Sequence, residues 1–283
     1  MNSVIRAWVN GDLVDTTAPA ISAIDHGVTV GDGVFETCKI EAGVPFALTR
    51  HFRRLERSAS GLGLGPLDLP YVQKGIDAVL SAGEPIDFGR LRFTVTGGRG
   101  PLGSDRHTDT ELTYVVTAAS QARPSRAAHL AVTPWTRNER SAVAGLKTTS
   151  YAENVVALAF AHERGAIEAV FANTRGDLCE CTGSNIFVVV GEQVCTPPLS
   201  SGALAGITRE LTIQWCRDAG IPVAEECLSL GVLRTCDEVF ITSSLRDVHG
   251  VERIDERVLP APGPVTARIA AIFAERAAAE VDP

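Results

Sequence analysis

Lysine is scarce in this chain of 283 residues, because only Lys39, Lys74 and Lys147 are lysines among its 26 basic residues. A guanidinium cannot replace a primary amine in covalent chemistry, so a reactive amine has three possible positions. Positive charge is also in deficit, since 34 acidic residues outnumber the basic ones and give a formal net charge of -8. This balance disfavours a polyanion as the main partner, and we expect no binding of nucleic acid.

Long apolar runs and metal-binding spacings are missing as well. No segment reaches the roughly 18 consecutive apolar residues of a membrane span, and the first residues, MNSVIRAWVNGD, lack a basic region followed by an apolar one. We therefore expect a cytoplasmic protein with no membrane partner. The seven cysteines include no CxxC pair, so neither a disulfide framework nor a metal site is indicated, although Cys179 and Cys181 would share one face of a strand.

What is present is the composition of a soluble globular protein, with 45% hydrophobic and 21% charged residues over a length typical of about two domains. Strand and helix patterns alternate along the chain, which predicts the α+β class. The stretch SQARPSRA, near 120–127, has no periodicity and contains a proline. We expect a small N-terminal domain over 1–119, a linker over 120–128 and a larger C-terminal domain over 129–283.

Local patterns predict the elements of the N-terminal part. Asn10-Gly11 separates two short apolar runs, which indicates a hairpin. Helices are predicted over 49–62 and 70–82 from the spacing of apolar residues. Alternation in the segment VFETCKI places three residues on one face of a strand: Phe35, Thr37 and Lys39.

Arg54 lies on the first of these helices, two residues after Phe52 in its apolar stripe. Two residues correspond to about 200° of rotation, so Arg54 should point away from that stripe. It would then be solvated, or it would reach into a cleft between the two domains.

Lys147 stands out among the lysines because of its surroundings. Its segment, SAVAGLKTTSYAEN, is made mostly of small uncharged residues, and no other lysine or arginine lies between Arg140 and Arg164. Desolvation in such a setting lowers the pKa of an amine and makes it nucleophilic, as a Schiff-base lysine requires. The alternative is an ordinary surface lysine that keeps its ammonium in water.

Two further sites in the C-terminal part suit a charged ligand. Glu180 lies in CECTGSN before an apolar strand; it is either a turn acid or a buried carboxylate with a partner such as a protonated pyridine nitrogen. Ile207 and Thr208 begin a predicted helix after two glycines, and a helix N-terminus offers free N–H groups to a phosphate. Ser243 and Ser244 follow a predicted strand and could add hydroxyl donors, or they are plain turn residues.

These segments, taken in order, resemble the class IV aminotransferases, the pyridoxal phosphate enzymes of fold type IV. The family includes D-amino acid and branched-chain aminotransferases and aminodeoxychorismate lyase. The resemblance covers nearly the whole chain and rests on six motifs: DHGVTVGDGVFET at 25–37, HFRRLERSA at 51–59, GLKTTSYAEN at 145–154, ECTGSNIFVV at 180–189, GITRELT at 206–212 and VFITSS at 239–244. It implies a small N-terminal α+β domain and a larger C-terminal pseudo-barrel, in a homodimer.

The resemblance also implies roles for individual residues. Lys147 would form the Schiff base with pyridoxal 5′-phosphate and then move a proton at the substrate's Cα, and Glu180 would pair with the pyridine nitrogen. Five residues would hold the phosphate: Arg54, Ile207 and Thr208 through their N–H groups where they begin the helix, and Ser243 and Ser244. Tyr151 lies near the position of a tyrosine that some members place on the cofactor's 3-oxygen.

The substrate is predicted from the strand face of Phe35, Thr37 and Lys39 and from the loop TGGRG at 96–100. The phenylalanine and threonine are closer to aminodeoxychorismate lyases, whereas the lysine is shared with D-amino acid aminotransferases. Gly97 stands where well-known D-amino acid aminotransferases carry an arginine, so Arg99 is the candidate anion contact in that loop.

We expect a transaminase that moves an amino group from a D-amino acid, or from an (R)-primary amine, to a 2-keto acid. The main alternative is an aminodeoxychorismate lyase that releases pyruvate and 4-aminobenzoate. A branched-chain aminotransferase is third, because the tyrosine-rich pocket signature is absent, and a non-catalytic pyridoxal phosphate binder is last. Arg137 and Arg246 are further candidate carboxylate contacts, or solvated residues.

Overall fold

The computed structural model describes residues 4–106 and 110–283 and divides into two compact units. The first unit contains the chain up to Arg123 together with Leu146–Tyr151 and Val281–Pro283. The second unit contains Pro124–Gly145 and Ala152–Glu280. The segment that carries Lys147 therefore belongs to the first unit, although it lies between two stretches of the second.

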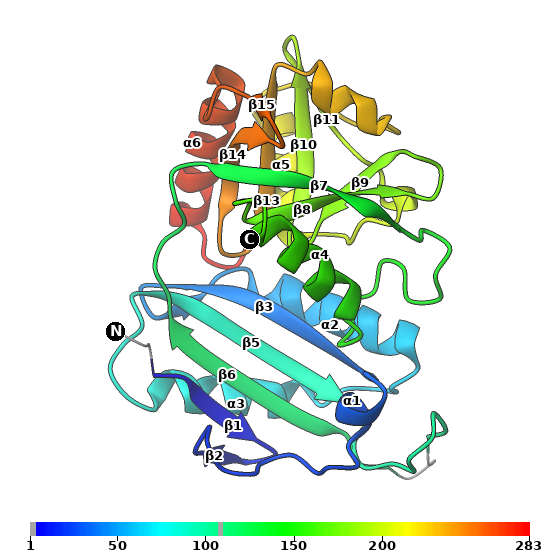
Figure 1. The fold of residues 1–283 in the computed structure, drawn as a ribbon. Helices are drawn as coiled ribbons and strands as arrows, with labels where there is room; N and C mark the ends of the chain where they lie inside the picture. The colour runs from blue at the N-terminus through cyan, green and yellow to red at the C-terminus, as the bar shows by residue number, and fades with distance from the viewer. Residues whose placement is uncertain (1–3, 107–109) are drawn as a thin grey trace. The chain divides into compact units, whose positions relative to one another are not determined.

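The first unit is a six-stranded sheet in the order β2-β1-β6-β5-β3-β4 among the described residues, with helices α2 and α3 on one face (Figure 1). Neighbouring strands are antiparallel. The bounds are β1 Arg6–Val9, β2 Asp12–Val14, α1 His26–Thr29, β3 Gly33–Glu41, β4 Val44–Pro45, α2 Leu48–Leu62, α3 Leu69–Ser81, β5 Phe88–Thr96 and β6 Thr113–Ser120.

The predicted hairpin and helices of this unit are confirmed. Asn10 and Gly11 both have positive φ, as the turn between β1 and β2 requires. The core lies between the sheet and the two helices, where Leu55 and Ala59 of α2 and Ile76 of α3 pack against sheet residues such as Phe93. The opposite face of β3 and β5 carries the residues singled out from the strand pattern.

The second unit is a curled nine-stranded sheet in the order β12-β11-β10-β13-β14-β7-β8-β9, with β15 paired to β14 (Figure 1). Its strands are β7 Ala128–Arg137, β8 Glu168–Asn173, β9 Leu178–Cys181, β10 Asn185–Val190, β11 Gln193–Thr196, β12 Val223–Glu225, β13 Glu238–Ser243, β14 Asp247–Ile254 and β15 Arg257–Val258. Its helices are α4 Ala152–His162, η1 Leu199–Ser201, α5 Ile207–Asp218, η2 Leu230–Arg234 and α6 Pro264–Ala279.

Two apolar layers hold this sheet. On one face, side chains from the strands themselves pack against one another in a cluster that includes Leu130, Val170 and Ile241. The other is covered by α5 and α6, where Ile213 and Ile269 join a cluster with residues of β10 and β13. The α+β class is confirmed, and no helix among the described residues is long and apolar enough to cross a membrane.

Candidate active site

Lys147 is fixed in the first unit by backbone contacts with β3 and α2. The N–H of Phe35 donates to the carbonyl of Lys147 at 3.0 Å, and the N–H of Lys147 donates to Ser58 Oγ at 3.2 Å. The N–H of Thr149 donates to the carbonyl of Gly33 at 2.8 Å. The segment therefore lies along the start of β3 as an extra edge, which explains why it belongs to this unit.

The ammonium of Lys147 faces aromatic rings. Its Nζ lies 4.6 Å from the ring centroid of Phe35 and 5.9 Å from that of Tyr151. These two rings contact each other edge to face, with centroids 5.3 Å apart. An amine against ring faces is partly removed from water.

The face of β3 that carries Phe35, Thr37 and Lys39 gains two arginines from β5. In the antiparallel register Thr37 lies opposite Arg92, and Lys39 lies opposite Arg90. Directly opposite residues share a face, so the cations of both strands gather on it. The guanidinium of Arg92 lies 3.7 Å from the Phe35 ring centroid, and burial lowers its pKa.

Arg92 was not among the residues predicted from the sequence. Its position opposite Thr37 depends on the register between β3 and β5, which the two strand patterns alone do not fix. Lys39 is buried, with its Nζ 5.0 Å from the Phe46 ring centroid.

Arg54 does not point into solvent, so that alternative is wrong. Its Nε and Nη2 donate to the two oxygens of Glu36 at 2.7 and 2.6 Å, and His51 Nδ1 lies 2.6 Å from the same carboxylate. Burial would raise the pKa of Glu36, but Arg54 and His51 outweigh it and lower that pKa to about 2. The buried face of α2 is therefore wider than its apolar stripe and includes His51, Arg54 and Ser58.

The loop at 96–100 is held to the start of α1, and it leaves Arg99 exposed. The buried Asp25 accepts hydrogen bonds from Thr96 Oγ1 at 2.7 Å and from Gly27 N at 2.8 Å. His26 N donates to the carbonyl of Gly98 at 2.8 Å. Arg99 is thus a surface residue of the first unit.

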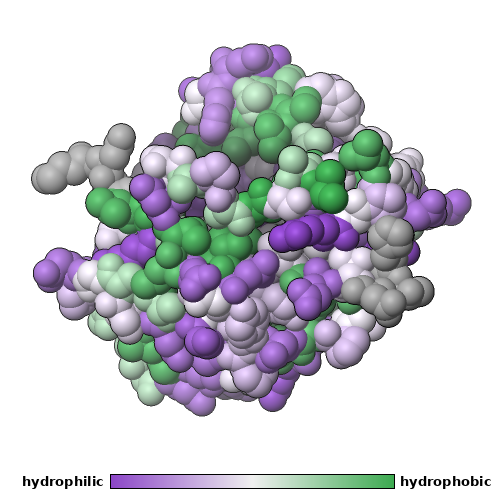
Figure 2. Space-filling model, turned by 90° about the horizontal axis from the view of Figure 1, so that it is seen from below, coloured by the Kyte–Doolittle hydropathy of each residue, from purple (hydrophilic) through white to green (hydrophobic). Residues whose placement is uncertain are grey.

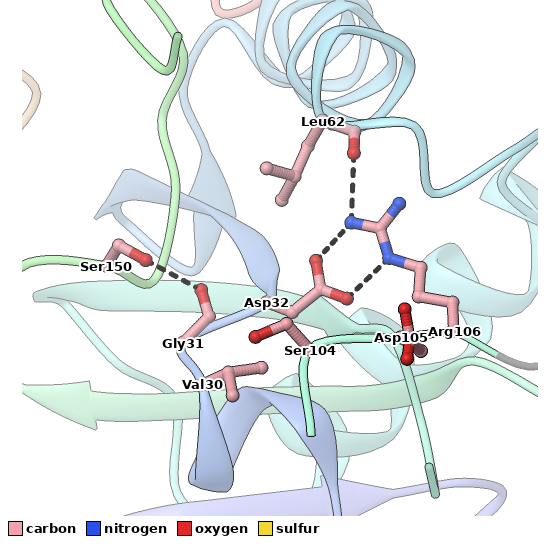
Figure 3. A pocket seen from close by; sticks show the side chains of 8 residues that line it. All are labelled: Val30, Gly31, Asp32, Leu62, Ser104, Asp105, Arg106 and Ser150. Carbon is pink, nitrogen blue, oxygen red and sulfur yellow. Dashed lines mark hydrogen bonds and ion pairs between the residues drawn. The ribbon is translucent and has the colours of Figure 1, made fainter. Parts of the chain in front are cut away.

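A cavity of about 490 Å³ lies in the same unit (Figure 3). Arg106 lines this cavity; its Nε donates to Asp32 at 2.6 Å, and its other nitrogens donate to the carbonyls of Leu62 and Gly63. Among the described residues its lining includes no predicted site residue: Val30, Gly31, Asp32, Leu62, Ser104, Asp105, Arg106 and Ser150. This cavity is therefore separate from the cationic face of β3 and β5.

Glu180 in the second unit is a partnered carboxylate on β9. One of its oxygens accepts from the N–H of Leu204 at 2.9 Å, and the other lies 3.5 Å from Arg137 Nε. Arg137 is held in turn by Glu153 and by Asn154 Oδ1, the latter at 2.6 Å. A neighbouring guanidinium and an N–H donor both favour the ionised form of a carboxylate. Arg137 is thus paired rather than solvated.

Four of the five residues predicted to bind a phosphate lie at one edge of the second unit, the candidate anion-binding edge, whereas Arg54 belongs to the first unit. Asn185 at the start of β10 pairs with Thr242 near the end of β13, so Ser243 and Ser244 emerge at that edge. Asn185 Nδ2 also donates to the carbonyl of Leu204 at 2.9 Å, which ties the loop before α5 to the same place. Because Leu204 N binds Glu180, the acid lies at this edge too.

The start of α5 offers donors to a ligand. Its N-cap residue is Gly206, which has no side chain that could accept hydrogen bonds from the first N–H groups of the helix. A Cβ at Gly206 would lie 1.9 Å from Asn185 Oδ1, so only glycine allows this close approach. Ile207 and Thr208 then present N–H groups at the positive end of the helix dipole, where an anion is stabilised.

Metal and disulfide chemistry finds no support in the described residues. No group of three or more His, Cys, Asp or Glu side chains there is placed to hold a metal ion. All seven cysteines are free thiols, and burial raises the pKa of Cys179 to about 12.

Comparison with known proteins gives a consistent result. The family model described as "Amino-transferase class IV" matches residues 33–254. A D-alanine aminotransferase of Bacillus licheniformis is 31% identical over 94% of each chain, and an aminodeoxychorismate lyase of Bacillus subtilis is 28% identical over 88% of this chain and 86% of that protein. The crystal structure of a branched-chain aminotransferase from Thermoproteus uzoniensis superposes with a TM-score of 0.88, at 28% identity, over 97% of this chain and 94% of that one.

The matched range includes Lys147 and Glu180 and also the candidate phosphate donors Ile207, Thr208, Ser243 and Ser244. The chain belongs to the class IV aminotransferases, the enzymes of fold type IV that depend on pyridoxal 5′-phosphate.

Proposed function

We propose that this enzyme is a transaminase that moves an amino group from a D-amino acid, or from an (R)-primary amine, to a 2-keto acid. The observation that carries the proposal is the Lys147 amine held against Phe35 and Tyr151, beside a sheet face lined with cations. The similarity to a D-alanine aminotransferase supports the choice of donor.

The residues present fit pyridoxal 5′-phosphate. Lys147 supplies the amine for its aldehyde, and Glu180 supplies an acid for its ring nitrogen. In the second unit, the N–H groups of Ile207 and Thr208 and the hydroxyls of Ser243 and Ser244 would supply phosphate donors, and we propose the guanidinium of Arg54 as a fifth. When bound, the cofactor supplies a cationic ring that accepts the electron pair left at Cα after proton loss.

The chain's own residues do the rest of the chemistry. Leu204 N and Arg137 both favour the ionised form of Glu180, which would then hold a proton on the ring nitrogen of the bound cofactor. The amine of Lys147 would act as the base that removes the substrate's Cα proton and later returns a proton. Phe35 and Tyr151 keep water away from that amine.

The substrate carboxylates belong on the cationic face. Arg92 is fixed by its stacking on Phe35, and Lys39 is buried beside Phe46, so both are preorganised to bind an anion. Thr37 lies opposite Arg92, two residues before Lys39 on the same face, and offers a hydroxyl. Arg99 is an exposed loop residue that adds a further anion contact.

The second candidate is aminodeoxychorismate lyase activity. Its substrate carries two carboxylates, and the three cations Lys39, Arg90 and Arg92 on one sheet face match that charge. The similarity to a lyase of Bacillus subtilis also favours it. In this reaction Thr37 would assist the elimination of pyruvate. Branched-chain transamination remains third and rests on the Thermoproteus neighbour.

We infer a cytoplasmic homodimer whose other partners are the small-molecule donor and acceptor. The free thiols suit a reducing compartment. Apolar side chains lie exposed in the first unit, including Val28 on α1 and Leu102. Figure 2 shows hydrophobic patches within the hydrophilic surface on one side of the molecule. A second copy of the chain would cover such side chains.

The test mixes the purified holoenzyme with D-alanine in the absence of any keto acid and follows the visible absorption of the bound cofactor. A transaminase loses this band and forms pyruvate equal in amount to the enzyme, while L-alanine leaves the band unchanged. Addition of 2-ketoglutarate then restores the band. Continuous release of pyruvate and 4-aminobenzoate from aminodeoxychorismate, with no response to D-alanine, would instead establish the lyase.

A further inference from the structure

A buried carboxylate joins two turns at the anion-binding edge of the second unit, and no step of the proposed reaction uses it. Glu168 is the first residue of β8 and is 2% exposed. A carboxylate this far from water is ionised only where donors replace its hydration. Its donors come from two segments that are distant in sequence.

The first segment is the loop between β9 and β10, which follows Glu180. Thr182 Oγ1 donates to Glu168 Oε2, and Gly183 N donates to the same oxygen at 2.8 Å. Thr182 N also donates to the carbonyl of Ala169 at 3.0 Å. The start of β8 therefore fixes the loop that leads from Glu180 into β10.

The second segment is the turn between β13 and β14. Arg246 Nη1 donates to Glu168 Oε1 at 2.5 Å, and Arg246 N donates to the carbonyl of Ser243 at 3.2 Å. Residues 243–246 thus form a closed turn whose last side chain is anchored on Glu168. Ser243 and Ser244, the proposed hydroxyl donors to the phosphate, lie within this turn.

We propose that Glu168 is a positioning residue: its carboxylate locks the Ser243–Arg246 turn against the loop after Glu180 and thereby sets how tightly the enzyme holds the cofactor's phosphate. The inference deepens the proposed function, because it rests on Ser243 and Ser244 as phosphate donors. Glu168 touches neither substrate nor cofactor in this account and acts through Arg246.

The experiment compares the affinity of the apoenzyme for pyridoxal 5′-phosphate with its affinity for pyridoxal, which lacks the phosphate. Glu168→Gln keeps the size of the side chain but removes the charge that anchors Arg246. We expect a loss of about tenfold or more in affinity for the phosphorylated form, the scale of one hydrogen bond to a charged group, and a change below about twofold for pyridoxal.

Glu238→Gln is the matched control. Glu238 is also a buried carboxylate, and it accepts from Val265 N at 3.0 Å and Thr266 N at 2.8 Å, at the opposite end of β13 from Ser243. This variant should leave the ratio of the two affinities unchanged. Arg246→Met provides a second route to the same test if Glu168→Gln fails to fold, because Arg246 is less buried than Glu168.

Two outcomes would overturn the inference. Equal losses for pyridoxal 5′-phosphate and pyridoxal in Glu168→Gln and Arg246→Met would mean that the ion pair only supports the fold. Unchanged affinities for both ligands in these variants would mean that the turn needs no anchor. The double variant Ser243→Ala/Ser244→Ala separates the two proposals: a selective loss there upholds the phosphate donors, and the absence of such a loss would remove them and the inference with them.

Discussion

The buried ion pair of Glu36 and Arg54 makes the stability of the first unit depend on one carboxylate. Glu36→Gln removes the negative charge and leaves Arg54, which is 5% exposed, without its main counter-charge. Breaking a buried pair by removing one partner costs about 3 to 5 kcal/mol, because the other charge stays buried. We expect Glu36→Gln to lower the free energy of unfolding at pH 7 by about that amount.

The pH dependence of the free energy of unfolding gives a second, independent value for the contribution of this ion pair. Arg54 and His51 outweigh burial and lower the pKa of Glu36 from 4.5 to about 2, a difference that corresponds to roughly 3 to 4 kcal/mol at about 1.4 kcal/mol per pH unit. Because the folded pKa is the lower one, this stability is present above pH 4.5 and is lost as the pH falls toward 2. In that window the wild type should lose about 1.4 kcal/mol per pH unit from this group, and Glu36→Gln should lack the contribution.

Urea unfolding at several pH values measures both effects. Glu41→Gln is the matched control, because Glu41 lies on the same strand and pairs with Arg123, but both side chains are exposed. A surface pair of this kind contributes under about 1 kcal/mol. The double variant Glu36→Gln/Arg54→Met should be more stable than Glu36→Gln alone, since it removes both buried charges. Equal costs for Glu36→Gln and Glu41→Gln, with no difference in pH dependence, would refute this reasoning.

Three further predictions concern the first unit. Arg92→Leu should raise KM for a substrate with a second carboxylate by about tenfold or more and affect KM for D-alanine less. The control is Lys74→Met, at an exposed lysine on α3, which should change neither KM. Steady-state kinetics on D-glutamate and D-alanine measures both. Asp282→Ala should lower the free energy of unfolding, measured in urea, by about 1 kcal/mol. Asp282 accepts hydrogen bonds from Thr49 N at 2.9 Å and from Thr49 Oγ1 at the start of α2, where the N-cap residue makes no side-chain hydrogen bond. No change would mean that water replaces this cap. Gly75→Val should cost about 1 to 3 kcal/mol or more, since a Cβ there would lie 2.6 Å from the Trp8 ring, and an unchanged thermal midpoint would contradict that packing.

Local sequence patterns predicted the parts of the fold that depend on local physics. The Asn-Gly hairpin, the helices α2 and α3 and the strand face of Phe35, Thr37 and Lys39 all follow from turn chemistry or periodicity. Strand β14 was not foreseen, because its sequence DVHGVERI mixes polar and apolar residues without strict alternation.

The site residues were predictable to different degrees. Lys147 could be singled out because amines are rare in this chain and its neighbours are uncharged. The burial of Arg54 could not, since its partner Glu36 lies on a neighbouring strand and breaks the apolar pattern of that face. Arg92 depends on strand register, and the place of Lys147 beside Phe35 depends on a backbone contact between segments more than a hundred residues apart.

Borohydride reduction of the holoenzyme followed by peptide mapping identifies the lysine that carries the cofactor. Only Lys39, Lys74 and Lys147 can carry the reduced cofactor on a side chain, so the map distinguishes them without ambiguity. The account predicts label on Lys147 alone and none on the side chains of Lys147→Ala. Label on Lys39 or Lys74 in the wild-type enzyme would contradict it.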